Sequence, residues 1–350
     1  MTFIVKSVQK KLMIGTAHNC SAHLRAPHFP CLIDLFSKNL PNIHISVRSC
    51  HDALITCSKI IFVGATRANR VSPVAHLKPE RRFALMKYFG FLFRFIVIPL
   101  AALTFWAWRD KKRGKDLPDT LKGIFPEAAL AGLATVAVAY TTPWDNYLVA
   151  TKVWWYDPKL VTGFLLGWVP IEEYTFFVLQ TLLTGSWLLF LARNLPVNEQ
   201  KPKNPMLIRL GVTAALALIW ARSVLAFLRG GKSRTYLSIT LAWALIPIMI
   251  QTLFGGDILW QHRRLVALGI IPTTIYLSAA DSLAIEGGTW TISPEKSINF
   301  KIGGKLPFEE ALFFFLTNTL ISMGMTLVLS KDSQKRVPPR VRRWLRLKDQ

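Results

Sequence analysis

Acidic residues recur in the same pattern in two apolar stretches of the chain. The acids are Asp145, Glu172 and Glu173 in the first copy, and Asp281, Glu309 and Glu310 in the second. The spacing from the aspartate to the first glutamate differs by only one residue between the copies. Carboxylates are costly in hydrocarbon, so acids near membrane-length segments indicate a functional site. The duplication predicts two similar halves that carry out acid–base chemistry.

Aromatic residues accompany the acids in both copies. They are Trp144, Trp154, Phe176 and Phe177 in the first copy, and Trp290, Phe313 and Phe314 in the second. Aromatic faces stabilise cations, although many tryptophans of membrane helices only pack or lie at the interface. We expect these seven residues to contact a substrate and to stabilise a cationic intermediate.

The acids could supply both a proton donor and a proton acceptor. Desolvation penalises the anion of a carboxyl group, so in an apolar pocket such a group can keep its proton and act as a general acid. A second carboxylate can then act as the base. Adjacent glutamates on a helix point about 100° apart, so only one of each pair can face the bundle centre squarely. The suggested reaction is protonation of an alkene, a carbocation intermediate, and deprotonation elsewhere.

No cofactor is expected. The chain has no GxGxxG after a strand, so a dinucleotide fold is not predicted. After Met86 it has no cysteine and a single histidine, His262, which disfavours haem and redox metals. Pro-x-Glu-Glu is also typical of a helix start, where proline and acids are both favoured. Its repetition with matched aspartate, tryptophan and paired phenylalanines favours the functional interpretation.

Composition predicts a multi-pass membrane protein. The 350 residues are 51% hydrophobic with a net charge of +23, and the basic residues stand in short blocks between long apolar runs. That pattern is not typical of a nucleic-acid-binding protein. About 20 apolar residues cross a bilayer. Candidate spans lie at 88–108, 124–143, 168–192, 207–228, 236–254, 264–284 and 306–329.

The expected fold is all-α, a polytopic bundle of about seven transmembrane helices with a parallel internal repeat in a three-plus-one-plus-three order. Ile-Pro steps at 98–99 and 246–247 extend the repeat to the first helix of each half. The expected divisions are an N-terminal extension (1–85), a first repeat (86–205), a connecting helix (206–235), a second repeat (236–330) and a basic tail (331–350). Such repeats share a site at their interface.

Basic residues predict the orientation. Lys and Arg blocks at 109–115, 193–209, 262–264 and 331–348 alternate with less basic loops. The positive-inside rule places these blocks and the C-terminus in the cytoplasm, with a bacterial cell membrane as the expected location. A smaller basic group at 229–234 lies on the opposite side. The tail is expected to contact lipid or solvent, not nucleic acid.

Residues 1–85 differ from the rest of the chain. They contain all four cysteines and six of the seven histidines, but no close CxxC or HxxxH pair that would indicate a metal site. We expect the natural start to be Met86; a targeting extension is the alternative.

The motifs Thr142-Pro143-Trp144-Asp145-Asn146, Pro170-Ile171-Glu172-Glu173 and Pro307-Phe308-Glu309-Glu310 resemble those of the integral-membrane lycopene cyclases, known as two subunits or as fused chains. The resemblance covers roughly 86–330 and implies conversion of the ψ ends of lycopene into β-ionone rings, without flavin or net redox change. It implies that the four glutamates are acid–base residues supported by the two aspartates. The second copy reads Ala-Ala-Asp281-Ser, so the halves can have unequal roles.

The resemblance further implies lycopene and γ-carotene, taken from the bilayer, as substrates, and other carotenoid enzymes as possible partners. Alternatives left open are a proton-coupled transporter, a cyclase that forms one ring only, and a non-catalytic subunit of a carotenoid complex. The sequence does not decide between β and ε rings.

Overall fold

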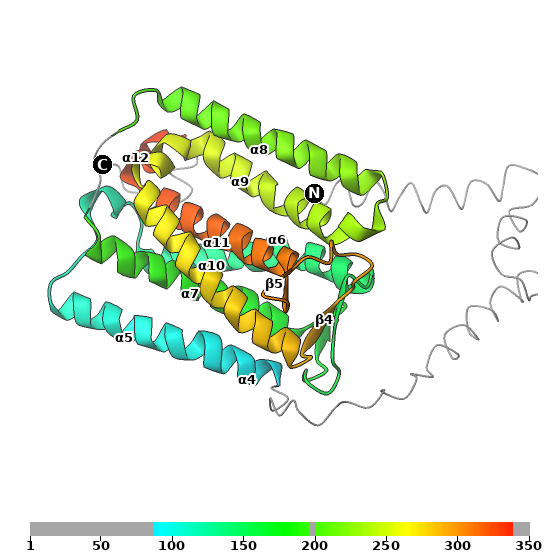
Figure 1. Cartoon of the computed structure of the whole chain (residues 1–350). Helices are drawn as coiled ribbons and strands as arrows, with labels where there is room; N and C mark the ends of the chain where they lie inside the picture. Colours follow the sequence, from blue (N-terminus) through cyan, green and yellow to red (C-terminus); the bar gives the residue numbers. More distant parts are fainter. Residues whose placement is uncertain (1–86, 197–200, 339–350) are drawn as a thin grey trace, which may run out of the picture. The chain divides into compact units, whose positions relative to one another are not determined.

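Seven long helices form the part of the chain that the computed structural model describes, residues 87–196 and 201–338 (Figure 1). The first is a continuous segment made of α4 (Tyr88–Leu92), the π-helix η1 (Phe93–Val97) and α5 (Ile98–Lys112). The others are α6 (Pro126–Ala150), α7 (Ile171–Asn194), α8 (Pro205–Leu228), α9 (Thr235–Gln261), α10 (Arg263–Glu286) and α11 (Phe308–Leu329). Short helices are η2 (Asp119–Leu121), η3 (Lys232–Arg234) and α12 (Lys331–Arg336). The extension predicted at 1–85 and the last part of the basic tail lie outside the described residues.

Six of these helices are long and apolar enough to cross a membrane, which confirms an all-α polytopic bundle. The sequence predicted about seven. The difference is α6, whose length is sufficient but whose C-terminal part is polar. That part continues past the predicted end of the span at 143 and contains Asp145 and Asn146. Asp145 therefore lies within the helix, more than one turn before its end.

Short antiparallel strands connect the helices at one end of the bundle. Strand β1 (Trp154–Tyr156) pairs with β4 (Trp290–Ile292), so the two halves are joined by backbone hydrogen bonds. The hairpin of β2 (Leu165–Leu166) and β3 (Val169–Pro170) leads into α7. The hairpin of β5 (Lys301–Ile302) and β6 (Leu306–Pro307) leads into α11. Both Pro-x-Glu-Glu segments thus begin a helix next to the β1–β4 pair.

Prolines inside the helices free backbone carbonyls, and aromatic side chains of other helices bind them. A proline removes the hydrogen bond to the carbonyl four residues earlier, and that carbonyl must find another donor in a membrane. Pro99 frees the carbonyl of Phe95, which accepts from Tyr276 Oη at 2.8 Å. Pro247 frees that of Trp243, which accepts from Tyr140 Oη at 2.9 Å.

These two bonds relate the halves of the molecule. In each half a tyrosine of the second long helix binds the freed carbonyl in the first helix of the other half. A third bond runs from Trp187 Nε1 to the carbonyl of Leu268, which Pro272 frees, at 2.9 Å. The Ile-Pro steps noted in the sequence therefore mark equivalent positions, at each of which a tyrosine binds a freed carbonyl.

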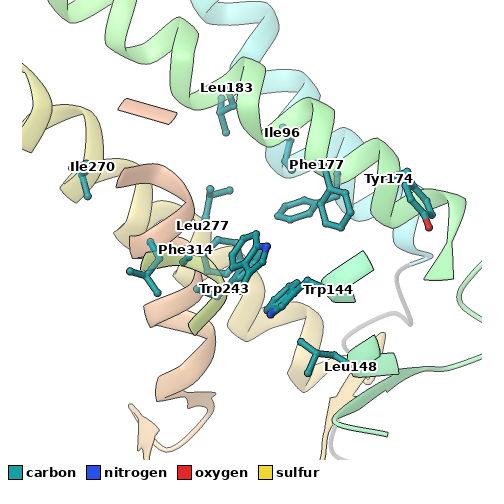
Figure 2. Packing of buried hydrophobic residues seen from close by; sticks show 14 of the residues in the cluster. Ile96, Trp144, Leu148, Tyr174, Phe177, Leu183, Trp243, Ile270, Leu277 and Phe314 are labelled. Atoms are coloured by element: carbon teal, nitrogen blue, oxygen red, sulfur yellow. The ribbon is translucent and has the colours of Figure 1, made fainter. Parts of the chain in front are cut away.

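The helices of the two halves pack around a shared aromatic core. Helix α6 packs against α7 and α10 against α11, while α11 also contacts α7 and α9. Helix α8 lies along α9 at the edge of the bundle, and its side chains are mostly exposed (Figure 1). Trp144, Trp243, Leu277 and Phe314 are among the buried residues at the centre of the core (Figure 2). The acids are positioned beside this core.

Candidate active site

A small cavity lies between the two halves, next to the β1–β4 pair. Its volume is about 50 Å³, which is room for a few water molecules. Three of the six predicted acids line it: Glu173, Asp281 and Glu310. Glu173 and Glu310 occupy equivalent positions in the first turns of α7 and α11. Both halves thus contribute an acid to one space.

A tyrosine from the first helix of each half binds the cavity glutamate of that half. Tyr88 Oη donates to Glu173 Oε2 at 2.6 Å, and Tyr236 Oη donates to Glu310 Oε1 at 2.7 Å. The two tyrosines are equivalent, since their backbone N–H groups donate to the loop carbonyls of Leu160 and Lys296 respectively. Each glutamate is thereby held with one oxygen bound and the other available.

A third tyrosine makes the two glutamates unequal. Tyr156 of β1 donates from Oη to Glu173 Oε2 at 3.1 Å. At the equivalent position of β4 stands Ile292, which has no hydroxyl group. Burial first, and then the charges of Asp145 and Glu173, raise the pKa of Tyr156 well above its ordinary value. The phenol therefore stays protonated and acts as a hydrogen-bond donor.

Glu172 and Glu309, predicted as acid–base residues, do not line the cavity. Both are buried, but their side chains bind the loop before their own helix. Glu172 Oε1 accepts from the backbone N–H of Thr162 at 2.6 Å, and Glu309 Oε1 from that of Ile298 at 2.7 Å. The physical reason is the 100° step of the helix, which turns the neighbouring glutamate away from the cavity.

The aspartates lie near the same glutamates. Asp281 lines the cavity, and the indole N–H of Trp290 donates to it. Asp145 is fully buried, and neither of its oxygens has a hydrogen-bond partner among the described residues. Within residues 87–196 and 201–338, no group of three His, Cys, Asp or Glu side chains is arranged to hold a metal ion.

Aromatic rings form most of the remaining wall. Of the seven predicted aromatic residues, those in the lining are Trp144, Trp154, Phe176, Trp290, Phe313 and Phe314. Phe177 is buried behind Phe176 and is not among the lining residues; their ring centroids are 6.2 Å apart.

Several rings meet across the halves. Trp144 stacks on Phe313 of the other half at 5.6 Å and on Trp243 at 4.4 Å. Trp154 packs against Tyr236 at 5.2 Å, and Trp290 against Tyr88 at 4.9 Å. Because Trp154 and Trp290 each pack on the tyrosine of the opposite half, both repeats contribute to the wall.

Six lining residues were missed by the sequence analysis: Tyr88, Phe91, Tyr156, Tyr236, Leu277 and Ile292. Trp243, which stacks on the lining residue Trp144, was missed as well. A signal for Tyr88 and Tyr236 was present, since both stand at the same distance before the proline of their helix. Aligning the first helices of the two halves would have paired them. Tyr156 has no counterpart in the second half, so the repeat could not indicate it.

Comparison with known proteins shows which family the chain belongs to. The sequence profile described as "Lycopene cyclase" matches residues 117–191 and 233–328, one segment in each half. The "Lycopene beta-cyclase" of Halobacterium salinarum is 39% identical over 200 residues, which cover 57% of this chain and 81% of that protein. The chain belongs to the lycopene cyclase family. It is a fused member, because both halves lie on one polypeptide.

Fungal relatives of this cyclase match over a smaller share of their length. The "Bifunctional lycopene cyclase/phytoene synthase" of Podospora anserina is 34% identical over 208 residues, 57% of this chain and 34% of that protein. The protein of the same name from Neurospora crassa is 36% identical over 203 residues, 55% of this chain and 33% of that protein. No solved structure matches the chain.

Proposed function

We propose that this chain is a lycopene β-cyclase that converts the ψ ends of lycopene into β-ionone rings, by way of γ-carotene to β-carotene. The observation that carries the proposal is the shared cavity, where Glu173 and Glu310 meet aromatic walls. An isomerisation by proton transfer requires an acid, a base and a surface that tolerates positive charge, and no oxidant. The membership of the family supplies the substrate class.

The reaction would begin with transfer of a carboxylic acid proton to the terminal double bond of the polyene. The resulting tertiary cation is attacked by a neighbouring double bond, which forms the ring bond and moves the charge into the ring. A carboxylate then removes a proton from a ring carbon, and a new double bond forms. Faces of Trp144, Trp154 and Phe313 would stabilise the cation.

In this proposal the two glutamates of the cavity transfer the protons, and the aspartates support them. Glu173 and Glu310 each have one oxygen held by a tyrosine and are therefore positioned for proton transfer. Asp281 and Asp145, which lie near these glutamates, would influence how readily each glutamate gives up or takes a proton. Glu172 and Glu309 would hold the loops that precede their helices, through the backbone N–H groups of Thr162 and Ile298. The division into repeats at 86–205 and 236–330, with a connecting helix at 206–235, remains our proposal for the organisation of the chain.

The protein lies in a membrane, and we propose an orientation for it. Strands β4 and β5 lie at one end of the bundle, and α12 lies at the other (Figure 1). Residues of β1 and β4 line the cavity. At the end with α12, Lys115 binds Asn194 at 2.8 Å and Arg336 binds Asp257. This basic end would face the cytoplasm of a bacterial cell. Lycopene and γ-carotene would reach the cavity from the bilayer, supplied by other carotenoid enzymes.

Expression of the full chain in lycopene-producing bacteria tests the function. Chromatography of the pigments is expected to show γ-carotene and β-carotene in place of lycopene. Unchanged lycopene, with intact protein in the membrane fraction, would contradict the proposal. Rings of the ε type would leave the cyclase assignment in place and correct the ring type.

A further inference from the structure

The two halves of the cavity are not equivalent in their hydrogen-bond donors. In the first half the donors converge on one group: Tyr88 and Tyr156 both donate to Oε2 of Glu173, at 2.6 and 3.1 Å. Trp154 Nε1 donates to Tyr156 Oη at 3.3 Å, which strengthens Tyr156 as a donor. Donors that bind the charged form of a carboxyl group favour that form. This half is built to hold a negative charge on Glu173.

In the second half the donors are divided between two acids. Tyr236 donates to Glu310 at 2.7 Å, while Trp290 donates to Asp281. Ile292 stands where the first half has Tyr156, so Glu310 has no second phenol. Conversely, Asp145 in the first half has no donor among the described residues. A charge in the second half is therefore favoured on Asp281 as much as on Glu310, which leaves Glu310 able to keep a proton.

We infer that the two halves divide the proton transfer: Glu310 is the acid that protonates the polyene, Glu173 is the base that deprotonates the ring, and Tyr156 is the positioning residue that makes them different. This inference rests on the proposed function. The O–H bond of Glu310 breaks as a C–H bond forms at the terminal alkene. A ring C–H bond then breaks, its proton passes to Glu173, and its electron pair becomes the new double bond. A proton transfer from Glu173 back to Glu310 completes the cycle without an oxidant.

Deuterium exchange distinguishes the acid from the base. Membranes containing Glu173→Gln or Glu310→Gln are incubated with lycopene in deuterated water, and the recovered lycopene is analysed by mass spectrometry. With Glu310 intact, Glu173→Gln still protonates the alkene, and the cation returns a proton to the same acid, so recovered lycopene carries deuterium. Glu310→Gln is expected to return unlabelled lycopene.

Three results would overturn the assignment: label only with Glu310→Gln, equal label with both variants, or label with neither. The wild-type chain in the same membranes must cyclise lycopene. Failure of the wild type would count against the proposed function itself, whereas an active wild type with the wrong labelling pattern counts against the assignment alone.

The pH dependence of cyclisation tests Tyr156 separately. A base must be ionised and an acid protonated, so the acidic limb of the rate profile reports the base and the alkaline limb reports the acid. Tyr156→Phe is expected to move the acidic limb by about one pH unit to higher pH, as for a tenfold loss of anion stabilisation. Tyr236→Phe is expected to move the alkaline limb and not the acidic limb, because Tyr236 donates to the acid Glu310.

Tyr147→Phe removes a hydroxyl from an exposed tyrosine of α6 and serves as the matched control, with neither limb shifted. If Tyr156→Phe lowers the rate equally at every pH, its hydroxyl has only a structural role and the inference is wrong. A shift of the alkaline limb by Tyr156→Phe would reverse the roles of the two halves.

Discussion

Neighbouring glutamates in this chain have different surroundings, although the sequence presents them as identical pairs. Glu173 and Glu310 face the cavity, whereas Glu172 and Glu309 bind loop N–H groups. The sequence alone predicted that one member of each pair would face the centre. It could not predict which, because the rotation of α7 and α11 about their axes is set by packing against other helices.

The difference between the paired glutamates can be tested by matched substitutions. Glu172→Gln keeps an oxygen that accepts from the Thr162 N–H, so it is expected to retain at least about a third of the wild-type rate, with a neutral hydrogen bond in place of a charged one. Glu173→Gln removes a proton-transfer group and is expected to lower the rate by about 100-fold or more. Cyclisation in isolated membranes, normalised to folded protein, measures both. Equal losses in the two variants would contradict the assignment.

Glu172→Ala separates stability from catalysis at the same position. Removing the acceptor breaks the hydrogen bond from the N–H of the exposed Thr162 to the buried Glu172 carboxylate, and loss of a hydrogen bond to a charged group is expected to cost about 1–3 kcal/mol in the free energy of unfolding. The unfolding temperature in detergent should fall for Glu172→Ala more than for Glu172→Gln. An unchanged unfolding temperature would show that the loop does not depend on this bond.

At the scale of helices, tyrosines of one half bind the carbonyls that prolines free in the other half. The π-helix Phe93–Val97 precedes Pro99, and Tyr276 binds the carbonyl that this proline frees. The Ile-Pro steps predicted that the first helices of the two halves are equivalent. They did not predict the tyrosine partners, because Tyr276 and Tyr140 come from helices distant in sequence, and only the folded bundle brings them to these carbonyls.

The proline–tyrosine contact predicts a coupling between two substitutions. Tyr276→Phe leaves the Phe95 carbonyl without its donor, and the expected loss of stability is roughly 1 kcal/mol. Pro99→Ala restores an N–H that can bind this carbonyl within the helix. The loss caused by Tyr276→Phe should therefore be smaller in the Pro99→Ala background, as measured by unfolding in detergent. Strictly additive effects would show that the Tyr276 hydroxyl does not replace the hydrogen bond that Pro99 removes.

At the scale of the whole molecule, the repeat was the most predictive feature of the sequence. It indicated two related halves with a shared site, and three of the six acids that it marked line the cavity. It could not indicate Tyr156, which breaks the repeat, nor the pairing of β1 with β4, whose partners lie far apart along the chain. Trp243 was also hidden, since a tryptophan in an apolar span is more often an ordinary packing residue. The features that the sequence did not predict lie where the two halves differ or where they contact each other.

One shared cavity makes a prediction that two separate sites would not. Lycopene has two ψ ends, and a protein with two acid clusters could process one end in each half. The described residues instead bring Glu173 and Glu310 into the same cavity, so both rings must form there in succession, with γ-carotene as the product of the first turnover. Either Glu173→Gln or Glu310→Gln should then prevent both rings and leave lycopene.

The pigment that accumulates in each single variant decides between the two arrangements. If each half served one end, the unaltered half would still close one ring, and γ-carotene would accumulate in either variant. If the cavity is shared, chromatography of cells expressing either variant should show lycopene alone, while Glu309→Gln cells still contain β-carotene. Co-expression of the two inactive variants extends the test, because a cavity that requires both acids on one chain cannot be restored by mixing chains that each lack one.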